Sequence, residues 1–515
     1  MKSVRRILWV LVGIVAFGVT GWAASETGPR TVSGFANETI DEHMLIDQYD
    51  GPATCVACHE EEAREMFGSV HYQWSGSTPN VPDISGPAGK GDRGFNTYCG
   101  TVVSSRRISC WGCHVGNGKA PSTQATAEQL NNIDCMMCHQ PLYERKARGP
   151  FETLTYTGFD GVSRSWELPV EDAEGNFQFE PDLVKMGIDI LTAARTVGKP
   201  TRAACLRCHA YAAGSDCGKR GDLSEASADA PADADVHLAP LGADLTCQSC
   251  HRSEDHRVLG RGLDLRPNDR PERLTCMTIG CHEDPPHDSS RINRHTARVA
   301  CQSCHIPEYA TLATTEMARV WETPVYYSGL LGGQGGFKPE EIREGNVLPT
   351  YRWYNGTSRV YALGQVAQAG TTGAYELGLP YGGVDSLTAQ IHPMKEHVST
   401  SGLHDATGQL IPQSTFTYFV TGDFDRAVQD GMTFAGLSGE WQTVDVHTYQ
   451  TINHGVEPSE NALGCGACHT DFSDGDPVCM DLKGDLGYQL KGPTAQICIQ
   501  CHEFESAARI RKNPP

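Results

Sequence analysis

The chain has 515 residues, 42 lysines and arginines and 63 aspartates and glutamates, which gives a formal net charge of −21 at pH 7. This excess of acidic residues argues against nucleic-acid binding and favours a protein that docks basic surfaces of its partners. Only 39% of the residues are hydrophobic, but 21 are cysteine and 20 are histidine. We therefore expect large bound cofactors to replace part of an aliphatic core.

The N-terminus predicts export from the cytoplasm. A basic start with Arg5 and Arg6 precedes an apolar run over residues 7–19, and small residues follow. This is the layout of a secretory signal peptide over residues 1–23, with cleavage after Ala23. An uncleaved N-terminal anchor is the alternative, because the run nearly reaches the length of a membrane span. In both cases we expect the remaining chain to be periplasmic.

Eight Cys-x-x-Cys-His units recur along the chain. Two thiols at this spacing can form thioethers to the two vinyl groups of one haem, and the histidine that follows can bind the iron. Zinc sites would pair their Cys-x-x-Cys units without needing a histidine after each. The units therefore predict covalently bound haem c. Their attachment cysteines are Cys55 and Cys58, Cys110 and Cys113, Cys135 and Cys138, Cys205 and Cys208, Cys247 and Cys250, Cys301 and Cys304, Cys465 and Cys468, and Cys498 and Cys501.

A ninth unit is looser, with four residues between Cys276 and Cys281 before His282. A larger loop still reaches both vinyl groups, so we expect nine haems in total. The cysteines outside all units are Cys99, Cys217 and Cys479. An odd number in an exported protein indicates one disulfide and one free thiol, and the sequence leaves the pairing open.

The number of histidines nearly matches the demand for iron ligands. The histidines expected on the proximal side are His59, His114, His139, His209, His251, His282, His305, His469 and His502. Eleven others remain: His43, His71, His237, His256, His287, His295, His392, His397, His404, His447 and His454. Mostly bis-histidine haems follow, and such ligation suits electron transfer at low potential.

Substrate chemistry would need one haem whose sixth position is open or weakly held. No histidine outside a unit occurs between His71 and His237, a stretch that contains the units at Cys110 and Cys135. The same stretch holds Lys146 shortly after the second of these units. A lysine binds iron only as the neutral amine, and considered alone Lys146 is an ordinary surface lysine.

Several stretches in order resemble the octahaem tetrathionate reductase family of c-type cytochromes, over nearly all of the mature chain. The matching stretches are "FNTYCG", "NNIDCMMCHQPLYERK", "CLRCHAYAAGSDCGKRGDL", "DADVHL", "LTCQSCHRSEDH", "PHDSSRINRHTARVACQSCHIPEYA", "LPTYRWYNGTSRVYALG" and "TINHGVEPSENALGCGACH". The resemblance implies a reductase in which one haem is bound by lysine in place of a distal histidine.

Carried over residue by residue, the catalytic haem is the one on Cys110, Cys113 and His114, with Lys146 as its distal ligand. The family also places an asparagine and a cysteine beside this haem, which match Asn96 and Cys99 here. The resemblance further implies distal ligation by His71, His237, His256, His287, His295 and His454.

The chain departs from the family pattern in three places. The family carries eight haems, whereas this chain ends with a further unit formed by Cys498, Cys501 and His502. The sixth unit is expanded, as described for Cys276 to His282. Cys217 and Arg220 stand where the family has a glycine-rich turn and a histidine. These changes affect the outer electron path more than the catalytic haem.

The units divide the chain into regions that we expect to form one intertwined body. After the signal region, residues 24–310 hold seven units, residues 311–464 hold none and supply distal ligands, and residues 465–515 hold the last two. We expect a mainly α fold with much irregular structure, organised around the attached haems, with little strand in the middle region.

Two functions of different classes follow. The first is a periplasmic reductase of a small sulfur or nitrogen compound (tetrathionate, nitrite or hydroxylamine), in which Cys99 engages a sulfur substrate. The second is an electron conduit without a substrate, between a quinol-oxidising membrane complex and partner cytochromes. A third possible function is the oxidation of hydroxylamine at the same haem. The sequence leaves the redox partner and the choice between monomer and homo-oligomer open.

Overall fold

A computed structural model describes residues 41–90, 94–95, 97–100, 111–265, 267–278, 280–469, 480, 482 and 484–489. The predicted signal region, Asn96, Cys110, Cys479, Cys498, Cys501 and His502 lie outside these residues. Among the described residues, no helix is both long enough and apolar enough to cross a membrane.

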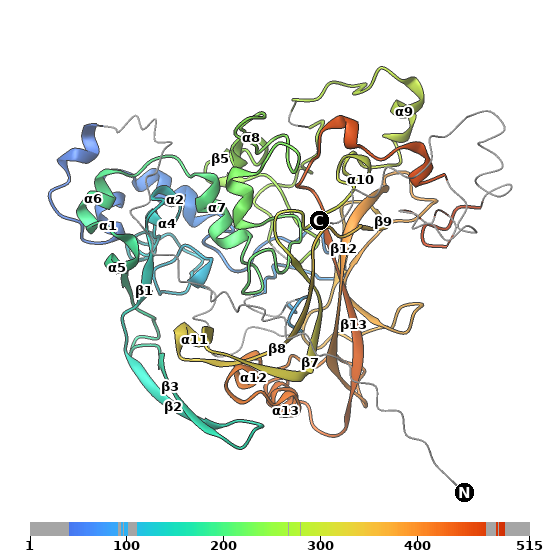
Figure 1. Cartoon of the computed structure of the whole chain (residues 1–515). Coiled ribbons are helices and arrows are strands. Elements are labelled where there is room, and N and C mark those ends of the chain that lie inside the picture. Colours follow the sequence, from blue (N-terminus) through green and yellow to red (C-terminus); the bar gives the residue numbers. More distant parts are fainter. Residues whose placement is uncertain are drawn as a thin grey trace, which may run out of the picture.

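Short helices carry most of the N-terminal half (Figure 1). They are η1 (Asp41–Leu45), α1 (Pro52–Val56), α2 (Glu60–Phe67), α3 (Ala127–Leu130), α4 (Met136–His139), α5 (Leu183–Met186), α6 (Ile190–Arg195), α7 (Arg202–His209), η3 (Glu225–Asp229), α8 (Cys247–Cys250), α9 (Ser290–His295) and α10 (Gln302–His305). Later helices are α11 (Leu330–Gly333), α12 (Thr415–Thr421), α13 (Phe424–Phe434), η4 (Ser459–Asn461) and η5 (Cys465–Ala467).

The attachment units coincide with helical turns for a geometric reason. Residues i, i+3 and i+4 of a helix share one face, so both cysteines and the histidine of a unit point the same way. The units at Cys135, Cys205, Cys247 and Cys301 coincide with α4, the C-terminal part of α7, α8 and α10 respectively. These helices are only one or two turns long, and tertiary packing must therefore stabilise them.

Polar caps fix the starts of several helices. The side chains of Thr126, Asp189, Thr201, Ser414 and Asp423 each accept a hydrogen bond from a backbone N–H in the first turn. Such caps stabilise a helix by about 1 kcal/mol each, which matters most for short helices.

The middle of the chain forms a seven-stranded sheet in the order β10-β11-β13-β12-β7-β8, with β9 paired to β12. Its strands are β7 (Thr315–Tyr327), β8 (Gly336–Glu344), β9 (Thr350–Tyr354), β10 (Ser358–Val360), β11 (Tyr375–Pro380), β12 (Gln390–His404) and β13 (Trp441–Thr451). The pairs β11–β13 and β12–β7 are parallel, and the others are antiparallel.

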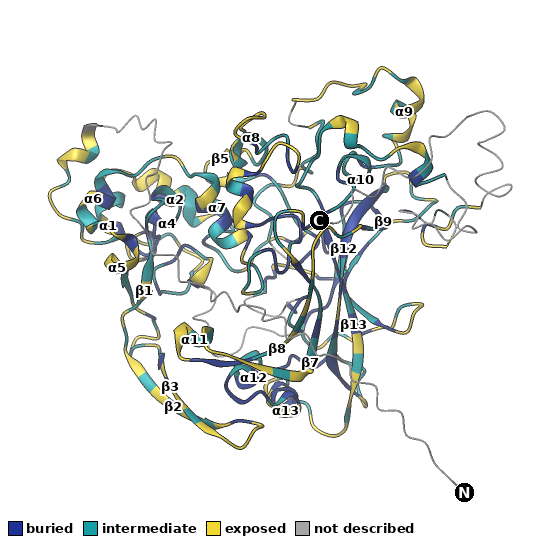
Figure 2. Cartoon of the chain, viewed as in Figure 1, coloured by how far each residue is buried: buried dark blue, intermediate teal, exposed yellow. Residues whose placement is uncertain are grey.

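Three two-stranded ribbons lie outside this sheet. They pair β1 (Arg145–Ala147) with β4 (Phe179–Pro181), β2 (Phe151–Thr157) with β3 (Ser163–Pro169), and β5 (Ser253–Glu254) with β6 (Arg257–Val258). The β2–β3 ribbon projects from the body and is largely exposed (Figure 2). Trp166 anchors it, because its buried indole N–H donates to the carbonyl of Gly335 at 2.7 Å.

The expectation of a mainly α chain is wrong. Of the described residues, 22% are helical and 24% lie in strands. The strand signal in this region is weak because β12, at the centre of the sheet, is buried along most of its length. A strand covered on both faces lacks the polar and apolar alternation that marks a half-exposed strand.

Helices α12 and α13 cover one end of the sheet through an aromatic core. The Trp321 ring of β7 lies 4.9 Å from the ring of Tyr418 and stacks at 6.4 Å on Phe424. The Tyr418 hydroxyl donates to the carbonyl of Trp321 at 2.7 Å. Trp321 is only 1% exposed, so this contact ties both helices to the sheet.

We expect Trp321→Ala to lower the free energy of unfolding by about 3–5 kcal/mol, because the loss of a buried tryptophan leaves a cavity. Urea unfolding followed by far-UV circular dichroism measures this. Phe434→Ala is the control, since Phe434 ends α13 and is 52% exposed. An equal loss in both variants would contradict the assigned role of the aromatic core.

Candidate functional site

Seven pairs of histidine rings face each other in the structure. Each pair joins the histidine of one attachment unit to a histidine outside the units. The pairs and their centroid distances are His43–His59 at 6.0 Å, His71–His209 at 6.3 Å, His139–His256 at 6.5 Å, His237–His282 at 6.1 Å, His251–His454 at 6.1 Å, His287–His305 at 6.2 Å and His295–His469 at 6.2 Å.

This distance fits a metal ion between the two rings. Two imidazole nitrogens, each about 2 Å from one metal, place the ring centroids roughly 6 Å apart. Direct ring stacking would bring them closer than this. The looser unit that ends in His282 has the same spacing as the regular units. The residues present therefore fit a haem at each of these seven units.

Hydrogen bonds at Nδ1 orient several of these rings toward their partners. His139 Nδ1 lies 2.9 Å from the carbonyl oxygen of Gly198, and His251 Nδ1 lies 2.9 Å from that of Leu259. Nδ1 contacts on the opposite rings include His256 with Glu65 at 2.8 Å, His287 with Asn293 at 3.1 Å, His295 with the carbonyl of Arg291 at 3.0 Å and His454 with Asp222 at 2.9 Å. A hydrogen bond at Nδ1 leaves Nε2 free to bind a metal.

His114 differs from the other unit histidines. Among the described residues, no second histidine ring faces it at the 6.0–6.5 Å spacing of the pairs. Its ring neighbour is Trp74, with centroids 6.1 Å apart and the planes at 65°. Burial, followed by the nearby His71, lowers the pKa of His114 to about 4, so its imidazole is neutral, as a metal ligand requires.

Lys146 lies on β1, opposite Glu180 of β4 in the strand register. Its Nζ is 3.4 Å from Glu180 Oε1, and both side chains are close to half exposed. An exposed pair of this kind contributes about 0–1 kcal/mol, so it holds Lys146 only weakly. Asn96 and Cys110, which the resemblance places at the same site, lie outside the described residues.

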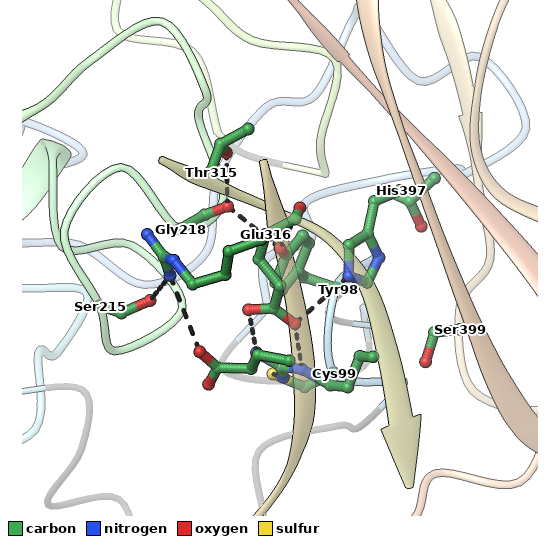
Figure 3. A network of polar contacts seen from close by, with 12 residues as sticks. Tyr98, Cys99, Ser215, Gly218, Thr315, Glu316, His397 and Ser399 are labelled. Atoms are coloured by element: carbon green, nitrogen blue, oxygen red, sulfur yellow. Dashed lines mark hydrogen bonds and ion pairs between the residues drawn. The ribbon is translucent and has the colours of Figure 1, made fainter. Parts of the chain in front are cut away.

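Cys99 sits at the edge of a buried ionic network (Figure 3). Arg319 donates to the sulfur of Cys99 at 3.2 Å, and its other nitrogens donate to the carboxylate of Glu316 at 2.6 and 2.9 Å. His397 Nε2 lies 3.4 Å from Glu316, and the His397 ring packs at 4.0 Å on Tyr98. A guanidinium beside sulfur is a setting in which a cysteine can act as a nucleophile.

The described contacts do not bring the two halves of the expected catalytic site together. Cys99 contacts Arg319 through its sulfur and Gln413 through its carbonyl oxygen. Among the described residues, no hydrogen bond or ring contact joins Cys99 to His114 or to Lys146. The proximity implied by the resemblance therefore stays a prediction.

Contacts between attachment units give them an order in space. Neighbouring units meet through thiol contacts, through packed helices or through closely placed cysteines. Side-chain contacts join Cys55 with Cys135, Cys205 with Cys247, and Cys276 with Cys301, and α4 packs on α7. Cys250 and Cys281, and likewise Cys304 and Cys465, lie close enough for their charges to interact. The resulting line runs from the flank with α1 to the opposite flank near α9 (Figure 1).

The unit that ends in His114 joins this line from the side. Cys113 contacts Cys208 of the Cys205 unit through their sulfur atoms, and the backbone N–H of Val115 donates to the carbonyl of His71 at 3.1 Å. His71 is the ring that faces His209 of that same unit. The His114 unit therefore lies beside the line, next to the Cys205 unit, and the carbonyl of its neighbour Val115 also accepts a hydrogen bond from the N–H of Asp134, directly before the Cys135 unit.

The sequence reasoning missed some residues and assigned too much to others. His43, which faces His59, carried no motif and was signalled only by the excess of histidines. The haem-free region was expected to supply ligands; among the described residues, His454 is the one of its five histidines that faces a unit histidine. The others make different contacts: His392 with the carbonyl of Pro393, His397 with Glu316, His404 with Thr407, and His447 with Glu396.

Comparisons with known proteins agree on the class. A family model described as bacterial cytochrome c matches residues 334–472. The crystal structure of octaheme cytochrome c from Shewanella oneidensis is similar with a TM-score of 0.64 and 27% identity, over 86% of this chain and 95% of that one. An uncharacterized protein of Archaeoglobus fulgidus is 28% identical over 255 residues, which are 43% of this chain and 80% of that protein.

The protein is a multihaem c-type cytochrome. Its haem c groups serve oxidation–reduction and electron transfer, as the cytochrome class implies. When bound, they would be held by the attachment cysteines and the paired histidines described above.

We expect His256→Ala to convert one haem from low to high spin, because the ring that faces His139 is removed. Electron paramagnetic resonance (EPR) of the oxidised protein measures this, with the haem count checked by intact mass. His447→Ala is the control, since His447 contacts Glu396 and no unit histidine. A high-spin signal in the control, or none in His256→Ala, would contradict the pairing.

The buried carboxyl of Glu316 makes the stability of the fold depend on pH. Burial alone would raise the pKa of Glu316, but the hydrogen bond with His397 and the Arg319 guanidinium lower it to about 2. The ordinary value is 4.5, so the carboxylate stabilises the fold above pH 4.5, and this contribution is lost as the pH falls toward 2. We expect Glu316→Gln to cost about 3 kcal/mol at pH 7 and much less at pH 2.5.

Urea midpoints at the two pH values measure this difference. Glu340→Gln, at an exposed position of β8, is the control and should change little at either pH. A cost for Glu316→Gln that is independent of pH would show that the network does not hold this carboxyl ionised.

Proposed function

We propose that this cytochrome is a periplasmic reductase of a small sulfur or nitrogen compound, tetrathionate, nitrite or hydroxylamine. The substrate site is the haem unit of Cys110, Cys113 and His114. The observation that carries this proposal is the environment of His114. Seven unit histidines face a second histidine, whereas His114 faces none among the described residues.

The seven histidine pairs act in this proposal as axial ligands of electron-transfer haems. Irons with two strong protein ligands have no position left for a substrate, so they are suited to electron transfer. The line of unit contacts supplies electrons to the Cys205 unit, and the branch at Cys113 passes them to the His114 unit. Counting the unit at Cys498, the chain carries nine haems.

Lys146 is proposed as the distal group of the His114 unit. With haem bound, its amine would hold the sixth position of the iron, and Glu180 would pair with the ammonium once a substrate displaced the amine and the amine took up a proton. Cys99 is proposed to contact a sulfur substrate, because Arg319 places a cation beside its sulfur. Asn96, three residues earlier, is assigned to the same site through the resemblance.

Electron relay without a substrate is the second candidate, and one observation favours it. The line of contacts continues beyond the branch, through the units at Cys247, Cys276 and Cys301 to the unit at Cys465. A substrate site that receives electrons from one end of the line does not need units on both sides of the Cys205 unit. Partner cytochromes or a quinol-oxidising complex would then dock at the two ends, and the acidic surface favours basic partners.

We expect Lys146→Ala to change turnover by about 100-fold while the protein keeps all its haems, because a misplaced ligand at the reacting centre has effects of that size. Anaerobic reoxidation of the fully reduced protein by tetrathionate, nitrite and hydroxylamine in turn, followed through the haem absorption band, measures this. Lys185→Ala is the control, since that side chain is 68% exposed on α5 and pairs with Asp182 at 3.9 Å.

The outcomes separate the two candidate functions. Rapid reoxidation by one compound that is lost in Lys146→Ala supports the reductase and identifies its substrate. Unchanged kinetics in Lys146→Ala would contradict the assignment of the lysine. If no compound reoxidises the protein while a basic cytochrome does, the relay is the better description.

A further inference from the structure

The guanidinium of Arg145 reaches from β1 into the loop formed by residues 111–116. Its Nη2 donates to the carbonyl of Trp111 and, at 3.2 Å, to that of His114. Its Nη1 donates to the carbonyl of Gly116 at 2.9 Å. One side chain thus bonds three carbonyls of the loop that holds the iron-binding histidine.

The position of Arg145 is itself fixed on two sides. Nη1 also donates to the carboxylate of Asp134 at 3.1 Å, and the two side chains are only 8% and 1% exposed. The hydroxyl of Tyr143 donates to the same carboxylate oxygen at 2.9 Å. The guanidinium lies 4.8 Å from the ring centre of Phe179, which belongs to the partner strand β4. A buried arginine held in this way has little freedom to move.

Arg145 is followed directly by Lys146. Successive residues of a strand point to opposite faces, so Arg145 faces the loop and Lys146 faces the other way. Both residues pair with β4, Arg145 opposite Pro181 and Lys146 opposite Glu180. The backbone that carries Lys146 is therefore held against the backbone of His114 by the bonds of a single neighbouring side chain.

We propose that Arg145 is the positioning residue of the proposed substrate site. Its hydrogen bonds set the distance between the backbones of His114 and Lys146. This distance would decide how readily the amine of Lys146 reaches the iron of a bound haem. This inference rests on the proposed function, because Lys146 is assigned to the iron only there.

The chemistry of the side chain explains why an arginine stands here. Its planar guanidinium has five N–H donors in a fixed fork, which can reach three carbonyls and a carboxylate at once. A lysine has the same charge, but its three donors lie on one nitrogen and cannot span these acceptors. Arg145→Lys therefore removes the geometry and keeps the charge.

The test uses the complete haem-loaded protein and reads the coordination of one haem. Carbon monoxide binds reduced haem iron only where the sixth position is open or weakly held, so it reports on the His114 unit. We expect Arg145→Lys to change the rate of carbon monoxide binding at least tenfold, with a new or altered signal from one haem in EPR. The signals of the paired haems and the haem count by mass should stay unchanged.

Arg148→Lys is the matched control. Arg148 lies three residues further along the same segment, is exposed, and bonds through its backbone N–H to the carbonyl of Gln178. We expect it to bind carbon monoxide and to turn over as the unaltered protein does. Arg145→Gln is a second test variant, which removes the charge as well and should show the same spectroscopic change.

Each other outcome has a definite meaning. A rate of carbon monoxide binding in Arg145→Lys and Arg145→Gln within twofold of the control would overturn the inference alone. The loss of one haem from the mass of both variants would assign Arg145 to haem attachment or folding, and would also overturn it. If the unaltered protein has no haem that binds carbon monoxide, the proposed function fails, and the inference fails with it.

Discussion

The structure depends on one constraint, that the attachment units at Cys135, Cys205, Cys247 and Cys301 each place two sulfur atoms and an imidazole on the same side of a helical turn. The turn is local, but the ring that faces it comes from another part of the chain. His251, for example, faces His454, which follows the last strand of the sheet. With haem bound, such a pair would close a long loop of the chain through the iron, and a chain with 39% hydrophobic residues would then need less aliphatic core.

The sheet adds the rigid part of this arrangement. Its last strand, β13, ends at Thr451, and Asp222 then receives the backbone N–H groups of Asn453 and His454 as well as His454 Nδ1. Asp222 is thus the group that orients His454 toward His251. The sheet also buries the ion pair of Glu316 and Arg319. Such a pair needs rigid surroundings, because moving one partner away would leave the other as a buried charge with neither a partner nor water.

The sequence predicted the units and, through the resemblance, six of the facing histidines, but not which unit each of these histidines faces. Cys-x-x-Cys-His is a local pattern, so its meaning could be derived without the fold. The facing histidines required long-range information, and only the resemblance supplied it for His71, His237, His256, His287, His295 and His454. His43 has no matching motif, and β12 lacks an alternating pattern because most of its residues are buried. The roles of Arg145 and Arg319 could not be predicted from the sequence. Arg145 bonds backbone carbonyls and Arg319 bonds a sulfur, and these partners are remote in the sequence.

The position of the His114 unit connects the two candidate functions. Among the described residues, it contacts the Cys205 unit through Cys113 and through the backbone of His71, and the carbonyl of Val115 accepts a hydrogen bond from the N–H of Asp134, directly before the Cys135 unit. A haem inserted within the line would have to pass every electron, and a substrate bound there would interrupt the relay. At a branch, the substrate site draws electrons from the line without obstructing it. The same arrangement of units is therefore compatible with a reductase whose remaining haems also exchange electrons between partners at both ends, and the local clamp made by Arg145 can tune the branch without disturbing that line.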